Sequence, residues 1–287
     1  MIDRLAIIGV GLIGSSLALA LKQAGKVGEV VGFGRNRDNL QTGIDLGVLD
    51  RFEDSIAATV AAADMVGVAV PLGAMQSVFA ELATSVRADT IITDVGSSKR
   101  SVVDAAKAEL GELMSRFVPG HPIAGAEKSG VEAGYAELYQ GRRVILTPSS
   151  ETDADAIAGV DAMWRDCGAS IEYLGIEHHD KVLAATSHLP HMLAYALVHH
   201  LSNLNEHEEI FRYSAGGFRD FTRIASSDPV MWRDVCLANS KPLVELIEQY
   251  QQELDRVAVA IRTNDGDELL RLFGRAKSER DSLIGNC

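Results

Sequence analysis

An apolar run near the start of the chain leads into three closely spaced glycines and then into a stretch rich in Leu and Ala. The sequence IIGVGLIGSSLALALKQAG spans residues 7–25, and Gly9, Gly11 and Gly14 stand in the order G-x-G-x-x-G. This pattern predicts a strand, a tight turn and a helix within a strand–helix–strand unit. It constrains the fold because the first glycine permits the turn and the third lets the helix pack closely on the strand.

The rest of the chain divides into two regions of different periodicity. Up to residue 175, strand-like and helix-like segments alternate, which predicts a parallel sheet with helices on both faces. The expected strands are residues 4–9, 29–34, 64–71, 90–97, 142–149 and 170–175, with a short strand and loop at 116–125. Only helical periodicity follows, with breaks near Pro190, 214–217, Pro229 and Gly266. We therefore expect an α/β Rossmann-type domain over 1–174 and an all-α domain over 175–287.

Charge and cysteine usage exclude several classes of protein. The net charge of −13 argues against nucleic acid or an anionic membrane as a partner. Cys167, Cys236 and Cys287 are odd in number and widely spaced, so we expect free thiols in a reducing, cytoplasmic compartment. The start of the chain lacks the basic segment of a signal peptide, so we expect none there. Asp64 and Pro71 interrupt the apolar stretch 56–72, so we expect no membrane span.

The glycine turn predicts a dinucleotide site. Its second glycine lets the backbone approach a pyrophosphate, and the following helix presents free N–H groups to the phosphates. The same site is expected to include further residues of the turn and of the end of the third strand, namely Leu12, Ile13, Val70 and Pro71. The alternative is that the glycines serve only the tight turn.

The end of the second predicted strand indicates which dinucleotide is preferred. NAD sites usually carry an acidic residue there, about 20 residues past the glycines, which binds the ribose 2′-hydroxyl. Here Gly34 occupies that position and Arg35, Asn36 and Arg37 follow. Guanidinium groups suit a 2′-phosphate, so we expect NADP to be preferred, with NAD possible. Alternatively, the two arginines are solvated loop residues and NAD is also used.

Three further stretches carry candidate functional side chains. Ser97 or Ser98, after the fourth strand, would cap the next helix and face the cofactor, unless Ser97 is an N-cap only. His121, between a glycine and a proline, is expected on a constrained loop, where a functional role is favoured over core packing. Arg219 and Arg223 are four residues apart and could share a helix face that binds an anionic substrate or forms surface ion pairs.

Histidines are crowded in the first part of the helical region. Such crowding can indicate zinc, but the chain has no H-E-x-x-H motif and Pro190 disturbs the helix between His188 and His191. We therefore expect no metal, and His199 and His200 are interpreted as surface or interface residues. The six histidines concerned are His178, His179, His188, His191, His199 and His200.

Five motifs, in order along nearly the whole chain, carry a family resemblance. They are GVGLIGSSLALALK, D-x-GSSK, GHPIAGAEKSGVEAG, SHLPHMLAYAL and GGFRDFTRIASSDPVMWRD. Together they resemble the prephenate/arogenate dehydrogenases of tyrosine biosynthesis. The resemblance implies a Rossmann domain joined to a helical domain that forms a homodimer. It also implies hydride transfer from a cyclohexadienyl ring to NADP or NAD, with loss of carbon dioxide and aromatisation of the ring.

The resemblance implies roles for four of these side chains. His121 matches the catalytic histidine, which accepts the proton of the ring hydroxyl. Ser97 matches a serine that touches the same hydroxyl and the nicotinamide region. His191 and Arg223 match residues that hold the carboxylate and side-chain groups of the substrate.

Four more residues take their expected roles from the resemblance alone. Glu127 matches an acidic residue at the mouth of the pocket. Arg219 stands where a relative has lysine, so its charge is kept but its geometry is not. Met231 and Trp232 match residues that reach the pocket from the partner subunit.

Two other functions stay open on the sequence. One is a different NADP-linked hydroxy-acid dehydrogenase with a catalytic lysine, for which Lys99 and Lys181 are the candidates. The other is a dinucleotide-sensing protein without catalysis, which would have no use for His121 together with Arg223. The sequence does not decide between prephenate and arogenate, because they differ only in a keto or an amino group on the side chain.

Overall fold

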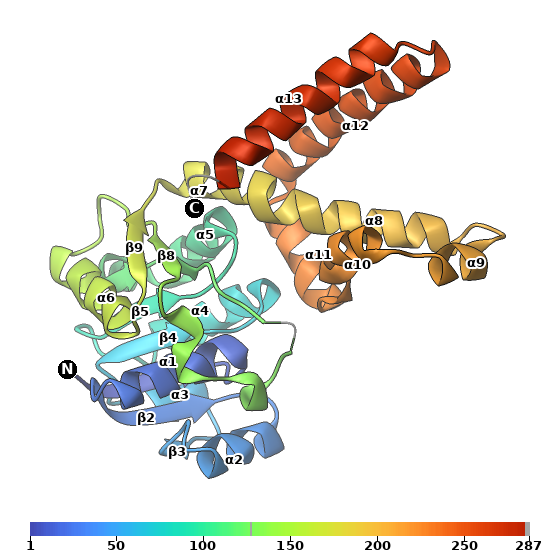
Figure 1. Cartoon of the computed structure of the whole chain (residues 1–287). Coiled ribbons are helices and arrows are strands. Elements are labelled where there is room, and N and C mark those ends of the chain that lie inside the picture. Colours follow the sequence, from blue (N-terminus) through green and yellow to red (C-terminus); the bar gives the residue numbers. More distant parts are fainter. Residues whose placement is uncertain (127, 285–287) are drawn as a thin grey trace. The chain divides into compact units, whose positions relative to one another are not determined.

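The computed structural model describes residues 1–126 and 128–284 (Figure 1). Glu127 and Cys287, two residues discussed above, lie outside the described residues. The chain forms two compact units, Met1–Ser240 and Lys241–Cys287. The expected domain boundary at 174/175 falls inside the first unit, at the point where strands give way to helices, and stays a prediction.

A six-stranded, fully parallel sheet forms the centre of the first unit (Figure 1). Its strand order, β3-β2-β1-β4-β5-β6, is the order of a Rossmann sheet. The strands are short apolar runs because both faces of the sheet are covered. Their bounds are β1 Ile2–Ile8, β2 Val27–Phe33, β3 Arg51–Phe52, β4 Met65–Val68, β5 Ile91–Asp94 and β6 Phe117–Val118.

Helices cover both faces of this sheet, as the alternating pattern predicts. Successive residues of β1 point to opposite faces, so Leu5 and Ile7 belong to one buried cluster and Ala6 and Ile8 to another. The first cluster contains α1 (Leu12–Gln23) and α6 (Ala154–Asp166), and the second contains α3 (Ile56–Val60), α4 (Met75–Ala83) and α5 (Lys99–Glu109). The remaining helical segments here are α2 Arg37–Asp45, η1 Leu72–Ala74, η2 Gly111–Arg116, η3 Val131–Ala133 and η4 Ala136–Tyr139.

The later strands do not join the parallel sheet, which corrects the expectation of one sheet. β7 (Gly120–Pro122), β8 (Arg143–Leu146) and β9 (Ser170–Tyr173) form a separate three-stranded sheet. The chain returns along itself after β7, so β7 and β8 pair antiparallel, with His121 opposite Ile145. His121 therefore lies on a short strand and not on a loop, and ladder hydrogen bonds on β7 restrict its backbone.

Helices complete the first unit, and the starts of α10 and α11 fall at the predicted breaks near 214–217 and Pro229. Their bounds are α7 Ile176–Leu183, η5 Ala184–His188, α8 Leu189–Ser202, α9 His207–Arg212, α10 Gly216–Thr222, η6 Arg223–Ser226 and α11 Pro229–Ala238. At Pro190 the helix is not interrupted, because the π-helical turn η5 links α7 to α8 and Pro190 stands in the first turn of α8. Such turns absorb an irregular backbone hydrogen-bonding pattern.

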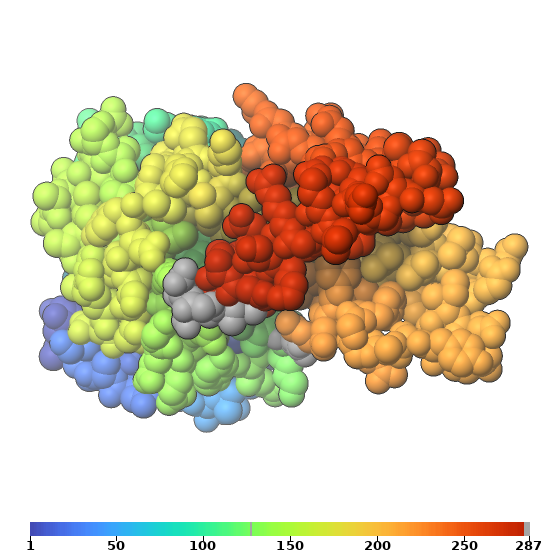
Figure 2. Space-filling model, turned by 45° about the horizontal axis from the view of Figure 1, so that its top comes forward, coloured from blue at the N-terminus to red at the C-terminus, as the bar shows by residue number. Residues whose placement is uncertain are grey.

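The second unit is an antiparallel pair of helices, α12 (Ser240–Arg262) and α13 (Gly266–Ile284). Figure 2 shows part of the outer surface of this unit in orange-red to red. Several large apolar side chains of α12 and α13 are exposed, namely Val244, Leu254, Val259, Ile261, Leu270, Phe273 and Leu283. In the described part of the chain, no helix has both the length and the apolar character needed to cross a membrane.

Candidate functional site

The glycine turn lies where the strand order reverses, between β1 and β4. Open parallel sheets bind ligands at this point, outside the carboxyl ends of the strands. Gly9 has a φ of +99°, and a Cβ there would stand 2.4 Å from the Ala69 carbonyl oxygen and 3.0 Å from Val70 Cγ1. The fold thus brings the turn against the residues that precede Pro71, and only glycine fits at position 9.

The start of α1 has the features of an anion site. Gly11 is the N-cap, no side chain caps the helix, and a Cβ on Gly11 would meet nothing within 4 Å. Gly14 is different, because a Cβ there would stand 2.4 Å from the Gly9 carbonyl oxygen and 2.9 Å from Ile7 Cγ2. Position 11 therefore leaves room for a ligand and position 14 lets the helix pack on the strand. These residues fit the pyrophosphate of a dinucleotide.

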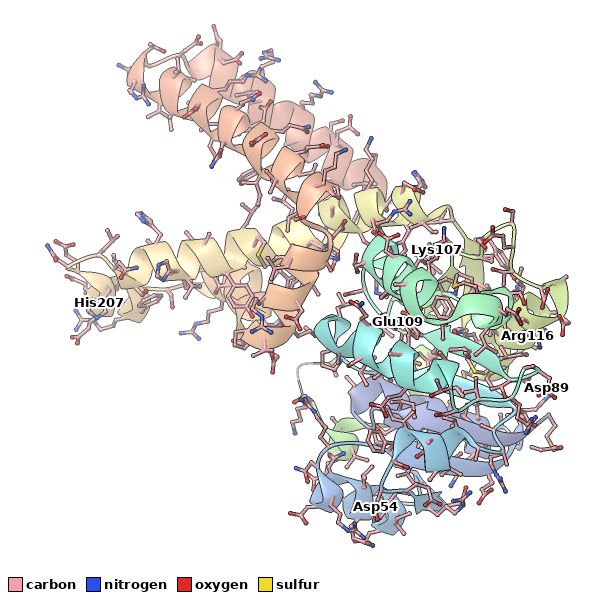
Figure 3. All side chains as sticks on the ribbon, turned by 180° about the vertical axis from the view of Figure 1, so that it is seen from behind. Asp54, Asp89, Lys107, Glu109, Arg116 and His207 are labelled. Atoms are coloured by element: carbon pink, nitrogen blue, oxygen red, sulfur yellow. The ribbon has the colours of Figure 1, made fainter. Side chains whose placement is uncertain are left out.

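The segment after β2 carries the two arginines considered for a 2′-phosphate. Gly34 and Arg35 follow the strand directly, and Arg35 is exposed. The Asn36 side chain accepts a hydrogen bond from the backbone N–H of residue 39 and so caps α2. Arg37 pairs with Asp54 at 2.6 Å, and Figure 3 labels Asp54 at the surface of the α/β part. Arg37 is thus already paired with a carboxylate, while Arg35 is the more available cation.

A buried carboxylate brings the two catalytic candidates together. Asp94, at the end of β5, accepts hydrogen bonds from the backbone N–H of Gly96 at 2.7 Å and of Gly120 at 3.1 Å. Ser97 and His121 follow these two glycines in the sequence. Ser97 is half-buried, and Ser98 occupies the N-cap position of α5. The alternative in which Ser97 serves only as the N-cap is therefore wrong.

Lys99 is part of this support and cannot act as a catalytic lysine. Its side chain and that of Asp94 are both 0% exposed, and Nζ donates to Asp94 at 2.6 Å and to the Gly120 carbonyl at 2.5 Å. Burial lowers the pKa of Lys99, while Asp94 opposes that shift. Lys181, the other lysine considered, is exposed on α7. The structure thus gives no support to a lysine-based site.

His121 is the first of three hydrogen-bonded side chains. Its Nδ1 lies 2.8 Å from His179 Nε2, and His179 Nδ1 lies 2.8 Å from Asp180 Oδ1. Burial, followed by the neighbouring His179, Lys99 and His188, lowers the pKa of His121 well below its ordinary value of 6.5. At neutral pH His121 is therefore uncharged and can accept a proton.

His188, His191 and Trp232 form an aromatic cluster beside these side chains. The rings of His191 and Trp232 stack with centroids 3.7 Å apart, and His191 Nδ1 bonds the Ser187 carbonyl oxygen at 2.9 Å. His188 Nδ1 lies 3.1 Å from Asn239 Nδ2. The family resemblance implied that Trp232 reaches the pocket from the partner subunit. Within one chain, Trp232 stacks on His191.

The arginines lie near this cluster or on the surface. Arg223 stands at the C-cap of α10 and contributes to lowering the pKa of His191, after burial, which places its charge close to that ring. Arg219 is exposed on α10 and Met231 is exposed on α11. Glu127 lies outside the described residues.

Sequence reasoning missed the supporting role of several residues, two of which, Lys99 and His179, it had considered for other roles. Asp94 and Lys99 form the buried pair, His179 and Asp180 extend the contacts of His121, and Asn239 donates to the Asp180 carbonyl at 2.8 Å. A carboxylate at the end of a parallel strand and the adjacent pair His179-Asp180 were the signals available. Over residues 1–126 and 128–284, no group of three or more His, Cys, Asp or Glu side chains could hold a metal ion.

Comparison with family models covers both parts of the chain. Residues 17–173 match the model described as prephenate dehydrogenase, nucleotide-binding domain. Residues 176–275 match the model described as prephenate dehydrogenase, dimerization domain.

Individual relatives match along almost the full chain. A cyclohexadienyl dehydrogenase of Zymomonas mobilis is 40% identical, covering 98% of this chain and 96% of the relative. A prephenate dehydrogenase of Bacillus subtilis is 37% identical, covering 99% of this chain and 76% of the relative. The crystal structure of prephenate dehydrogenase from A. aeolicus with hydroxyphenyl propionate and NAD+ has a TM-score of 0.92 and 36% identity, covering 99% of both chains.

Proposed function

The chain belongs to the prephenate dehydrogenase family, and from this premise we propose that His121 is the base that accepts the ring hydroxyl proton of prephenate, arogenate or both. The enzyme is an oxidoreductase that couples oxidation of its substrate to decarboxylation in tyrosine biosynthesis, with NAD(P). The observation that carries the proposal is the buried His121 side chain, which among the described residues is hydrogen-bonded only through Nδ1 and whose pKa is lowered by burial.

The substrate chemistry explains why a neutral base is needed. Hydride leaves ring carbon C4 as its hydroxyl becomes a carbonyl, so the hydroxyl proton must be removed in the same step. When bound, NAD(P) supplies the acceptor for that hydride. Loss of carbon dioxide from C1 then makes the ring aromatic. A base held near the hydroxyl typically contributes about 10²–10⁴-fold to the rate.

Other residues of the site hold the substrate in this proposal. Ser97 contacts the hydroxyl, a role that the family resemblance implies, and Asp94 supports it by accepting hydrogen bonds from the amides of the residues that precede Ser97 and His121. His191, backed by Trp232, contacts the substrate side chain or carboxylate together with Arg223.

Three remaining substrate contacts rest on the family resemblance. Arg219 and Met231 are exposed on α10 and α11, where a substrate or a partner subunit can reach them. Glu127, whose position lies outside the described residues, is proposed for the substrate side chain.

We propose NADP as the preferred cofactor, with NAD also used. The absence of an acid at Gly34 and the exposed Arg35 support this preference. In the same proposal, the turn with Gly9, Gly11, Leu12 and Ile13 binds the pyrophosphate, Gly14 lets α1 pack beneath it, and Val70 and Pro71, which follow β4, line the site. Asn36 orders the loop that carries the arginines.

We further propose a homodimer formed through the helical part, with the domain boundary at 174/175. The family model over residues 176–275 and the exposed apolar side chains of α12 and α13 support the homodimer, and the meeting point of the two family models supports the boundary. An apolar surface of this kind is typical of a helix pair that packs on a second copy. The cytoplasmic location expected from the sequence stays a prediction.

An initial-rate matrix tests the function. The purified protein is assayed with prephenate and with arogenate, each with NAD and with NADP, by following reduced nicotinamide. We expect turnover that is higher with NADP, and Arg35→Ser should raise the KM for NADP about tenfold, the value of one charge-assisted contact.

The matched variant for the chemistry is His121→Asn. It should keep cofactor affinity and lose turnover by about 10²-fold or more. Wild-type turnover in this variant would refute the role of His121, and no turnover in any of the four wild-type combinations would refute the proposed function.

A further inference from the structure

His121 is the last member of a row of three buried side chains, which are linked by hydrogen bonds in a fixed order of donor and acceptor. The row runs from Asp180 through His179 to His121, with both hydrogen bonds at 2.8 Å. His179 is 0% exposed, Asp180 is 4% exposed and His121 is 9% exposed. Because no bulk water surrounds these bonds, the position of each proton is determined by the neighbouring groups.

Asp180 sets the direction of the row. Its Oδ1 accepts a hydrogen bond from the backbone N–H of Lys99 at 2.7 Å, and its Oδ2 accepts one from that of Arg100 at 2.9 Å. Burial opposes ionisation, but the hydrogen bonds from His179 and from these two amides lower the pKa of Asp180. A carboxylate has only lone pairs to offer, so His179 Nδ1 must carry a proton and donate it.

The proton on His179 Nδ1 determines the proton on His121. Burial is the main cause that lowers the pKa of His179, so its ring is neutral at pH 7 and its Nε2 has a lone pair. His121 Nδ1 must then carry the proton that fills the 2.8 Å contact. The opposite arrangement on His121 would set two lone pairs against each other at this distance.

The remaining nitrogen of His121 is the one left for chemistry. With the proton on Nδ1, Nε2 has a free lone pair. Among the described residues no hydrogen bond engages Nε2, and Nε2 is not one of the buried polar atoms without a partner, so it keeps access to the surface. His121 Nε2 is therefore an unprotonated acceptor before any substrate binds.

We infer that His179 and Asp180 are positioning residues. They hold His121 in the tautomer whose Nε2 is unprotonated and can accept the proton of the substrate hydroxyl. This inference rests on the proposed role of His121 as the base. It extends that role to two residues of α7 that need not touch the substrate.

The kinetic test uses three variants at positions 178 and 179. His179→Leu removes the acceptor for His121 Nδ1–H, so either ring nitrogen of His121 then carries the proton in part of the population. His179→Gln restores an acceptor oxygen near the place of Nε2. His178→Leu is the matched control, because His178 is exposed on the same helix.

The expected result separates positioning from binding. His179→Leu should lower kcat about tenfold or more, a part of what a general base contributes, while the KM for prephenate changes less than about threefold. His179→Gln should recover most of the lost kcat, and His178→Leu should behave like the wild type. A wild-type kcat in folded His179→Leu would overturn the inference.

A second measurement needs no turnover and reads the tautomer in the wild-type protein, with a variant used only to assign the resonance. Long-range ¹H–¹⁵N NMR spectra of protein labelled at histidine nitrogen report which ring nitrogen carries the proton, and the resonance missing in His121→Asn assigns His121. We expect His121 in the wild type with the proton on Nδ1. A proton on Nε2 would overturn the inference.

The two measurements also separate this inference from the proposed function. If the wild type oxidises neither prephenate nor arogenate, the proposed function fails, whereas the NMR spectrum still reports the tautomer. If the wild type is active but the tautomer is the opposite one, the positioning role alone fails.

Discussion

Lys99→Met should destabilise the first unit strongly, because it leaves a carboxylate buried without its cation. Asp94 and Lys99 are both 0% exposed and 2.6 Å apart. Removing one partner of a buried ion pair typically costs about 3–5 kcal/mol. Met has nearly the length of the Lys stem, so the substitution adds little cavity cost.

The remaining contacts of Asp94 place the expected cost at the low end of that range. Its Oδ2 still accepts the Gly96 amide and its Oδ1 the Gly120 amide. The Gly120 carbonyl, however, loses the 2.5 Å bond from Lys99 Nζ. We therefore expect a loss of about 3 kcal/mol in the free energy of unfolding.

Urea unfolding of the full chain, followed by tryptophan fluorescence, measures this loss. Trp164 and Trp232, the two tryptophans of the chain, both lie in the first unit. With a slope of about 2 kcal/mol per molar urea, the midpoint should fall by about 1.5 M. Lys107→Met is the matched control, because Lys107 is exposed on the same helix (Figure 3) and should cost no more than about 0.5 kcal/mol.

The double variant Asp94→Asn/Lys99→Met tests the reason for the loss. Replacing the unpaired Asp94 carboxylate by a neutral amide should recover about 1–2 kcal/mol of the free energy of unfolding relative to Lys99→Met alone. Replacing both partners of a buried ion pair destabilises a protein much less than removing one of them. A loss below about 1 kcal/mol in Lys99→Met, or a double variant less stable than the single one, would refute the reasoning.

Two further predictions concern the glycine turn and acid stability. Gly14→Ala should cost about 1–3 kcal/mol in urea unfolding, because its Cβ would stand 2.4 Å from the Gly9 carbonyl oxygen. Gly11→Ala should keep wild-type stability and lose affinity for NADPH in a fluorescence titration, and equal effects of the two changes would contradict this assignment. Burial lowers the pKa of His188 from 6.5 to about 4, so its contribution to stability is lost as the pH falls from 6.5 towards 4. Wild type should therefore lose about 2 kcal/mol more than His188→Gln between pH 7 and pH 5, and equal losses would exclude His188 as the cause.

Local sequence predicts the parts of the fold that depend on local physics. Apart from β3, the strands of the parallel sheet lie in largely apolar segments bounded by glycine, proline or charged residues, so their places could be predicted within a few residues. The turn at Gly9 follows from a positive φ that glycine adopts readily, and the start of α11 at Pro229 follows from the fixed φ of proline.

Short strands, the pairing partners of strands and the exact residue at a helix start were harder to predict from the sequence. The two-residue strand β3 has too few residues to show a periodic pattern. The separate sheet in which β7 pairs antiparallel with β8 and β8 pairs parallel with β9 depends on contacts between distant segments, which no local pattern encodes. The N-cap of α5 is Ser98, one of the two serines expected at this helix start, and the local pattern does not choose between them.

By itself, the sequence determined the Rossmann turn, the change from strands to helices and the family motifs around His121 and Arg223. Only the tertiary structure decided what supports His121. His179 is 58 residues away along the chain, and Asp180 binds the amide of Lys99 across 81 residues. Such contacts form where β7, α5 and α7 meet in space, because the packing of those elements excludes water and leaves each buried polar group to find its partner there.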